Sequence, residues 1–179
     1  TRRELLLLAL MSSENRAAHA LARTYPGGEA AFVKQMNLKA SELGMDSSHF
    51  KDPTGLAAGN VSSARDLVKM VHAAATYPMI RKSTTMRQHQ VRPYKSRGEL
   101  SYRNTNRLLK NEHWDINLSK TGYINEAGRC LVMQATIASR PLTIVLLDSF
   151  GKLTPFGDSN RIRKWIESGL SSRDQIASL

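Results

Sequence analysis

Two short segments of the chain bring hydroxyl, amide and ammonium groups close together, namely Ser13-Glu14-Asn15 and Lys120-Thr121-Gly122. Such groups take part in hydrolytic chemistry when the fold places them around one substrate. In a chain of this composition, about 0.9 matches to S-x-N are expected by chance, against roughly 0.04 matches to K-T-G. The lysine motif is therefore the informative one. Because it leads into apolar segments that predict core strands, we expect it at the edge of a sheet.

Each motif also has an explanation that involves no chemistry. Ser13 and Asn15 could cap a helix that begins near Arg16, since serine and asparagine favour that position. Lys120 could be a solvated strand residue, with Thr121-Gly122 as a turn. At this level both explanations stay open.

The remaining chemistry-bearing residues predict no metal or cofactor. The five histidines show no metal-ligand spacing, and no H-E-x-x-H motif is present, which argues against a zinc peptidase. The one cysteine, Cys130, excludes an internal disulfide framework, and its apolar neighbours predict an inert core thiol. Glu14 is predicted to be a helix N-terminal charge rather than a catalytic acid.

The first half of the chain has a helical pattern. Apolar residues follow helical spacing over residues 16–43, with a break at Pro26-Gly27-Gly28. Residues 45–61 are loop-like, with Asp52-Pro53-Thr54-Gly55 as a turn signal. Ser63 is then predicted to cap a further helix that ends before Pro78.

The second half has the pattern of strands followed by one closing helix. Residues 86–103 are polar, which is typical of an exposed hairpin, and apolar segments at 129–138 and 141–148 predict two adjacent core strands. Ile162, Trp165 and Ile166 mark a last helix, and we expect residues 171–179 to form a polar tail. This order predicts an α/β fold of the α+β type, with a helical cluster packed on an antiparallel sheet.

The beginning of the chain predicts a buried helix. Thr1 and Glu4 fit a capping box, and residues 5–11 are apolar on nearly every face but too few to span a bilayer. Such a helix belongs inside a domain, and the chain begins without Met. We therefore expect residues 1–179 to be the larger, C-terminal part of one catalytic domain whose N-terminal part is missing. Within it, residues 1–84 are mostly helical, and residues 85–170 form the sheet and closing helix.

The charge of the chain is strongly basic. Its 26 lysine and arginine residues against 15 acidic ones give a formal net charge of +11. Residues 81–110 contribute +8 of it, from nine basic residues against Glu99, with Tyr94 and Tyr102 interleaved. This pattern suggests an anionic partner, and it makes a basic nucleic-acid-binding module the remote alternative. Because no known nucleic-acid motif is present, we expect no nucleic acid as partner and interpret the stretch as a basic face, away from the two motifs, that contacts other anionic material.

Several segments in a fixed order resemble one family. They are Leu8–Ala18, Phe50–Leu56, Asn104–Leu109, Lys120–Tyr123 and Ala127–Val132. Together they resemble the low-molecular-mass penicillin-binding proteins of the D-alanyl-D-alanine carboxypeptidase/endopeptidase family of serine peptidases, and in particular the penicillin-binding protein 7-like branch. The resemblance implies a β-lactamase/transpeptidase-like fold.

The resemblance also implies roles for six residues. Ser13, Asn15 and Lys120 are the catalytic candidates: Ser13 as the relay that passes a proton to the leaving amine, Asn15 as a hydrogen-bonding partner of the substrate carbonyl, and Lys120 as the positive charge of the site. Thr121, Gly122 and Tyr123 are the substrate-binding candidates. The Thr121 hydroxyl binds a carboxylate, Gly122 leaves room for the substrate beside the strand, and the Tyr123 backbone N–H is an oxyanion donor.

The family's nucleophile motif, S-x-x-K, is absent at the expected place upstream of Ser13. Ser48-His49-Phe50-Lys51 and Ser149-Phe150-Gly151-Lys152 match it in letters, but both come after S-x-N, and about one match is expected by chance. We therefore interpret both as decoys. The expected nucleophile belongs to a missing N-terminal segment, and we expect the isolated chain to be inactive.

The resemblance predicts a hydrolase of peptidoglycan that acts by serine acyl transfer. The main hypothesis is a D-alanyl-D-alanine (D-Ala–diaminopimelate) endopeptidase for cell-wall remodelling, with peptidoglycan peptide stems as substrates and β-lactams as acylating inhibitors. A D-alanyl-D-alanine carboxypeptidase and a non-catalytic peptidoglycan-binding member are the alternatives. The implied location is the bacterial periplasm.

Overall fold

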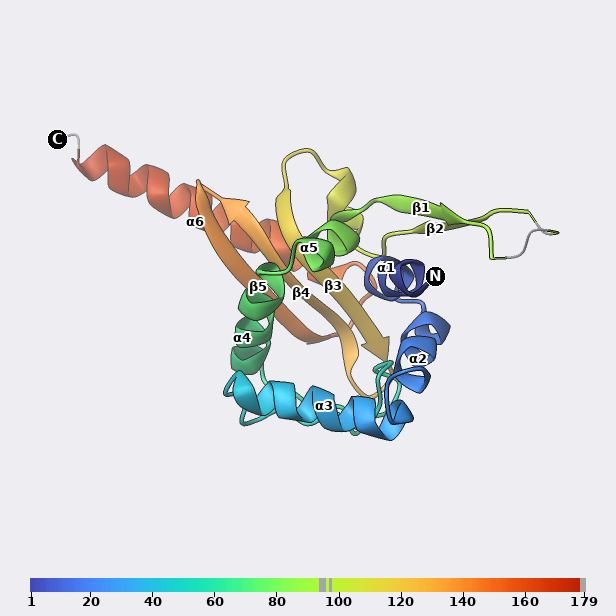
Figure 1. The fold of residues 1–179 in the computed structure, drawn as a ribbon. Helices are drawn as coiled ribbons and strands as arrows, with labels where there is room; N and C mark the ends of the chain where they lie inside the picture. Colours follow the sequence, from blue (N-terminus) through green and yellow to red (C-terminus); the bar gives the residue numbers. More distant parts are fainter. Residues whose placement is uncertain (94–95, 97, 178–179) are drawn as a thin grey trace.

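The computed structural model describes residues 1–93, 96 and 98–177 and shows helices first, then strands, then a closing helix (Figure 1). The helices before the sheet are α1 (Arg2–Ser12), α2 (Asn15–Arg23), α3 (Gly28–Glu42), α4 (Ala64–Ala75) and α5 (Pro78–Thr85). The capping residues that the sequence predicted for these helices are present. Thr1 and Glu4 form the capping box of α1, Gly44 takes the left-handed conformation after α3, and Ser63 caps α4.

A three-stranded antiparallel sheet forms the centre of the second half. Its strands β3 (Asp115–Ile124), β4 (Gly128–Ile137) and β5 (Arg140–Ser149) lie in the order β3-β4-β5. The prediction of two adjacent strands at 129–138 and 141–148 is thus confirmed. Lys120-Thr121-Gly122 lies in β3, which pairs with β4 on one side and is an edge strand among the described residues. This placement confirms the expected position of the motif.

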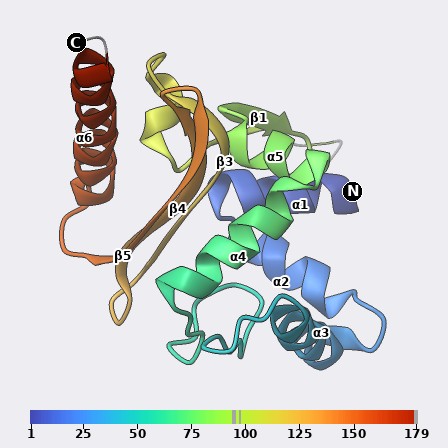
Figure 2. The ribbon, with the colours of Figure 1, turned by 90° about the vertical axis from the view of Figure 1, so that its left-hand side faces the viewer.

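Helices cover both faces of the sheet (Figure 2). On one face, α6 (Thr154–Ala177) packs Phe156, Ile162 and Ile166 against a core that includes Leu131 and Met133, both fully buried. On the other face, Val71 of α4 packs with Leu118 and Val132. The predicted helix-on-sheet architecture therefore holds, and the sheet is the middle layer.

Helix α6 is longer than its sequence pattern predicts. It continues to Ala177, so residues 171–177 are helical and the expected tail over 171–179 is wrong for all the residues that the structure describes there. Past Gly169 the sequence contains no glycine or proline to stop a helix, which explains the extension. Trp165 marks the helix as predicted but faces outward, with 75% of its surface exposed.

A two-stranded hairpin and a short 3-10 helix connect α5 to β3. The hairpin pairs β1 (Gln88–Val91) with β2 (Leu100–Arg103), as predicted for residues 86–103, and η1 (Arg107–Lys110) follows it. Tyr94, Lys95 and Arg97, which belong to the predicted basic stretch, lie outside the described residues. Helix α1 packs beside α2, α5 and β2, with Leu8 and Met11 buried among them.

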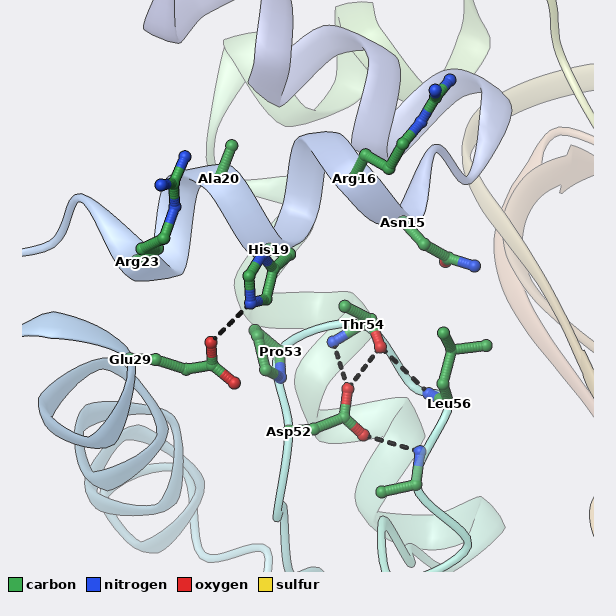
Figure 3. Close-up of a pocket in the computed structure, with 11 residues that line it drawn as sticks. Asn15, Arg16, His19, Ala20, Arg23, Glu29, Asp52, Pro53, Thr54 and Leu56 are labelled. Carbon is green, nitrogen blue, oxygen red and sulfur yellow. Dashed lines mark hydrogen bonds and ion pairs between the residues drawn. The ribbon is translucent and has the colours of Figure 1, made fainter.

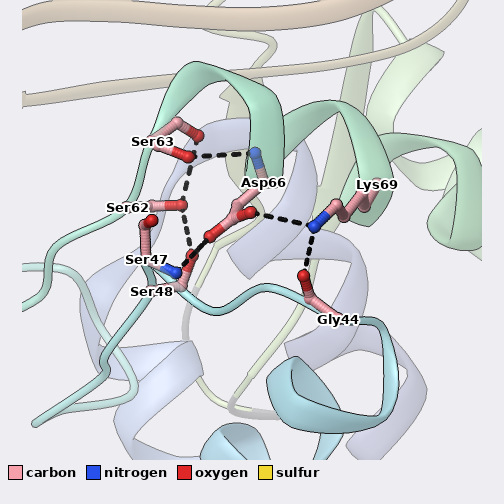
Figure 4. Close-up of polar contacts among 7 residues, drawn as sticks. All are labelled: Gly44, Ser47, Ser48, Ser62, Ser63, Asp66 and Lys69. Carbon is pink, nitrogen blue, oxygen red and sulfur yellow. Dashed lines mark hydrogen bonds and ion pairs between the residues drawn. The ribbon is translucent and has the colours of Figure 1, made fainter.

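A buried carboxylate holds the loop after α3 against α4 (Figure 4). Asp66 is only 3% exposed, and it accepts hydrogen bonds from the Ser47 backbone N–H at 2.8 Å and the Ser48 hydroxyl at 2.9 Å. Lys69 contacts Asp66 at 3.3 Å and also donates to the Gly44 carbonyl. Burial alone would raise the pKa of Asp66, but these hydrogen bonds and the Lys69 charge outweigh it and hold the pKa below 3.8.

Replacing Asp66 by asparagine is expected to destabilise the protein at pH 7 and to flatten the pH dependence of its stability. Because the folded pKa lies below the unfolded value, the charge stabilises the fold above pH 3.8, and this stabilisation is lost as the pH falls through the folded pKa. Urea unfolding at pH 7, 4 and 2.5 measures both effects. The exposed Asp46, replaced in the same way, is the matched control. An Asp66→Asn variant as stable as its parent at pH 7 would contradict this account.

Candidate active site

The junction between α1 and α2 presents Ser13 to the sheet. Ser13 ends α1 in the left-handed conformation, with φ 54° and ψ 40°, and the chain then turns into α2. The helix-capping explanation for Ser13 and Asn15 is wrong, because Glu14 is the N-cap of α2 and accepts from the Arg16 backbone N–H at 3.2 Å. The prediction for Glu14 is confirmed. The Arg16 side chain, which bonds the Glu14 carboxylate, lowers the pKa of that carboxylate.

Lys120 joins the two motifs across the cleft. Its Nζ donates to Ser13 Oγ, which lies 107 residues away in sequence, and to the Thr121 carbonyl at 2.8 Å. As a whole residue Lys120 is half-buried, but protein atoms desolvate the ammonium at the end of its side chain. This burial lowers the pKa of Lys120 from 10.5 to about 8. At neutral pH the site therefore holds a charged amine directly on the serine hydroxyl.

A second hydroxyl lies beside the threonine of K-T-G. Thr121 Oγ1 donates to Thr105 Oγ1 at 2.6 Å. Thr105 is presented by a turn in which the Asn104 side chain donates to the carbonyls of Thr84 and Met86, both at 2.9 Å. Residue-by-residue reasoning assigned no role to Thr105. The asparagines on either side of Thr105 favour such local turns, and they were the feature of the sequence that could have indicated this turn.

The cleft that contains these residues is large and basic. It has a volume of about 1240 Å³ and includes Ser13, Asn15, Thr105 and all of Lys120–Tyr123. Among the described residues, two carboxylates line it, and both are engaged: Glu14 with Arg16, and Asp52 within its own loop. In the same part of the chain, its basic residues are Arg103, Arg107, Lys110, Lys120, Arg129 and Lys152.

The expectation that the basic stretch 81–110 lies away from the motifs is therefore wrong in part. Arg103, Arg107 and Lys110 line the same cleft as Ser13 and Lys120. The reason is topological. Strand β2 returns from the hairpin toward the body of the molecule (Figure 1). Thr105, just after it, donates its backbone N–H to the Met11 carbonyl at 3.3 Å. This contact brings the following residues to the end of α1.

Cys130 does not lie in the core, contrary to the sequence-based prediction. It is half-buried and lines the cleft, where its thiol donates to the Ala127 carbonyl at 3.3 Å. Cys130 pairs across the sheet with Gly122, and a side chain built at Gly122 would place its Cβ 3.7 Å from the Cys130 Cβ. Because Gly122 has no side chain, it leaves Cys130 uncovered on the cleft side.

In both S-x-x-K matches within the chain, the serine takes part in local contacts that do not involve its lysine. The Ser48 hydroxyl bonds Asp66 and Ser62 (Figure 4). The Lys51 side chain lies against Gly59. Ser149 is the last residue of β5, where it pairs with Arg129. In neither match does a hydrogen bond of the described residues join the serine to its lysine, so neither forms a nucleophile–base pair here.

A second cavity of about 680 Å³ lies on the other side of Asn15, between α2, the start of α3 and the Asp52 loop (Figure 3). The Asp52 carboxylate holds this loop by accepting from the backbone N–H groups of Thr54 at 2.6 Å and Ala57 at 2.8 Å, which confirms the predicted turn. His19 and Glu29 pair at 2.9 Å and join α2 to α3. Asn15, which lines both cavities, marks the boundary between them.

Over 1–93, 96 and 98–177, no group of three histidine, cysteine, aspartate or glutamate side chains is arranged to hold a metal ion. Within the same residues, no helix has both the length and the apolar character needed to cross a membrane.

Comparison with known proteins identifies the family. A family model described as D-alanyl-D-alanine carboxypeptidase matches residues 1–151, which include both motifs. The chain belongs to the D-alanyl-D-alanine carboxypeptidase family. It is 51% identical over 169 residues to a D-alanyl-D-alanine endopeptidase of Pseudomonas aeruginosa and 50% identical to one of Escherichia coli. Each alignment covers 94% of this chain and 54% of the relative, so the chain spans about half the length of these curated family members.

Solved structures of the family show the same fold. The Streptomyces K15 DD-transpeptidase is 28% identical and superposes with a TM-score of 0.83 over 91% of this chain and 66% of its own. A D-alanyl-D-alanine carboxypeptidase from Mycobacterium tuberculosis is 33% identical, with a TM-score of 0.75 over 84% of this chain and 57% of its own. The expected β-lactamase/transpeptidase-like fold is therefore confirmed.

Proposed function

We propose that the protein containing this chain is a peptidoglycan DD-peptidase that works by serine acyl transfer, and more specifically a D-Ala–diaminopimelate endopeptidase. The observation that carries the proposal is the contact between Lys120 and Ser13, which joins the S-x-N and K-T-G motifs in one cleft. The endopeptidase relatives at 50% identity or more favour the finer assignment.

In the proposed reaction, a serine hydroxyl attacks the D-alanyl carbonyl, and the carbonyl oxygen becomes an oxyanion near the Tyr123 backbone N–H. The Lys120 ammonium donates to Ser13 Oγ, so the serine's own proton is directed outward and is available to the leaving amine. When the C–N bond breaks, this proton passes to the amine nitrogen, and the proton that the attacking serine gave up to its base then restores the Ser13 hydroxyl. Water then hydrolyses the acyl-serine and restores the enzyme.

The attacking serine and its lysine base are proposed to come from a segment outside residues 1–179. Two observations support this: neither S-x-x-K match brings its serine and lysine together, and the alignment with the Pseudomonas aeruginosa relative covers 54% of that protein. The chain would then supply two walls of the site. Ser13 and Asn15, at the junction of α1 and α2, form one, and Lys120, Thr121, Gly122 and Tyr123 of β3 form the other.

The substrate is proposed to lie along the free side of β3 as an added strand. Gly122 supports this placement because its missing side chain leaves room for a second backbone. The hydroxyls of Thr121 and Thr105 then face the leaving group, and the basic cleft suits the carboxylates of peptide stems. We further propose the periplasm as the place of action, with β-lactams as acylating inhibitors and the basic face in contact with anionic cell wall or membrane.

Acylation and hydrolysis by the full-length protein test the proposal. Labelled penicillin should attach to one serine outside residues 1–179, as mapped by mass spectrometry of the peptides. A D-Ala–diaminopimelate cross-linked muropeptide should be cleaved to monomers. Release of D-alanine from a pentapeptide, with no cleavage of the cross-link, would favour the carboxypeptidase instead. Binding of peptidoglycan without penicillin attachment or hydrolysis would favour a non-catalytic member and overturn the proposal.

A further inference from the structure

One arginine of the cleft is fixed in place without an acidic partner. The Arg129 guanidinium lies over the ring of Tyr123, with its central carbon 3.6 Å from the ring centroid. The two residues are direct cross-strand partners on β3 and β4. Among residues 1–93, 96 and 98–177, Arg129 forms no side-chain hydrogen bond or ion pair. Its N–H donors are therefore available to a ligand.

Neighbouring contacts support this arrangement. The Tyr123 hydroxyl donates to Asn125 Oδ1 at 2.9 Å, which anchors the far end of the ring. Gly128, just before Arg129, has φ +62°, and a Cβ there would lie 2.5 Å from Asp148 Oδ1 and 2.9 Å from the Asp148 backbone. The turn is thus packed against the end of β5. A guanidinium positioned in advance loses little conformational entropy when it binds a planar anion.

The position of Arg129 indicates which part of a substrate it meets. Ser13 and Thr121 surround the proposed place of the leaving amine, and the Tyr123 backbone N–H follows along β3 at the proposed place of the scissile carbonyl. A substrate added along β3 must therefore extend its acyl-donor part past Tyr123 toward the β3–β4 turn. Arg129 lies at that end of the cleft.

We propose that Arg129, stacked on Tyr123, binds a free carboxylate of the acyl-donor stem on the amino-terminal side of the scissile bond. In the substrate of the proposed function, this is the carboxylate of the diaminopimelate that precedes the scissile D-alanine. The assignment rests on the proposed function. It makes Arg129 a specificity determinant that distinguishes stems with a free carboxylate from amidated ones, since an arginine–carboxylate pair is strong and a neutral amide cannot replace it.

The test measures kcat/KM of the full-length protein for two cross-linked muropeptides, one with the free donor carboxylate and one with it amidated. The unaltered protein is expected to prefer the free form by about 10- to 100-fold, the range typical of a charge-assisted hydrogen bond. In Arg129→Gln this ratio should fall to near one. Arg140→Gln, an exposed arginine at the β4–β5 turn, removes the same charge and should leave the ratio unchanged.

Two variants of Tyr123 test the role of the ring. Tyr123→Phe keeps the stacking surface and should keep most of the preference, whereas Tyr123→Leu should reduce it. An equal rate for the two substrates in the unaltered protein, or a ratio that survives in Arg129→Gln, overturns the inference. If the unaltered protein cleaves neither substrate and takes up no penicillin, the proposed function itself fails, so the two failures are distinguishable.

Discussion

Replacing Lys120 by methionine is expected to slow acylation by penicillin strongly while making the full-length protein more stable. Lys120 supplies the charge on the Ser13 hydroxyl, and loss of one such preorganised electrostatic contact slows acyl transfer by about 10²–10³-fold. Methionine fills a similar volume without charge. The rate constant for labelling by fluorescent penicillin measures the first effect, and urea unfolding measures the second.

The stability gain follows from the pKa of Lys120. Burial lowers this pKa from 10.5 to about 8, so the folded protein holds fewer protons than the unfolded chain between those two values. Below pH 8 the buried charge destabilises the fold by about 3 kcal/mol at most. The cost disappears as the pH rises toward 10.5. Lys120→Met should therefore be more stable than its parent at pH 7, and the difference should shrink by pH 10.

The matched control for this prediction is Lys164→Met, which replaces an exposed lysine of α6. It should change neither the labelling rate nor the pH dependence of unfolding beyond a few tenths of a kcal/mol. A Lys120→Met variant that is less stable than its parent at pH 7 would show that the Ser13 and Thr121 contacts outweigh desolvation. Normal labelling by that variant would remove Lys120 from the mechanism.

Replacing Ser13 by alanine or by glycine is expected to slow hydrolysis equally but to leave the glycine variant more stable than the alanine variant. Both variants lose the hydroxyl proposed to carry a proton to the leaving amine, a role worth about 10²–10⁴-fold in rate. The backbone of Ser13 is left-handed, with φ 54°. That conformation strains an L-residue by roughly 1–2 kcal/mol and does not strain glycine. Ser13→Gly should thus unfold at higher urea concentration than Ser13→Ala.

This pair of variants separates chemistry from backbone geometry at the same position. Initial rates on a cross-linked muropeptide report the hydroxyl, and urea midpoints report the strain. Retention of activity in Ser13→Gly but not in Ser13→Ala would mean that the site needs the turn and not the hydroxyl. Equal stability of the two variants would contradict the strain at this turn.

Local signals predicted most of the elements. The capping box at Thr1, the cap at Ser63 and the strands on either side of the 138–139 turn all lie where propensity and periodicity place them. These features depend on neighbours within a few residues, so the sequence contains them directly. The end of α6 was missed because residues 171–175 are all polar, and such a segment gives no periodic signal.

The sequence by itself determined the two motifs, the order of helices and strands, and the family resemblance. The tertiary structure alone decided three matters at the site: the Lys120–Ser13 contact, the entry of Arg103, Arg107 and Lys110 into the cleft, and the exposure of Cys130 beside Gly122. The tertiary structure likewise decided the stacking of Arg129 on Tyr123. The physical reason is that contacts between distant segments depend on how β3 pairs with β4 and packs beside α1. No local preference of the chain specifies that arrangement.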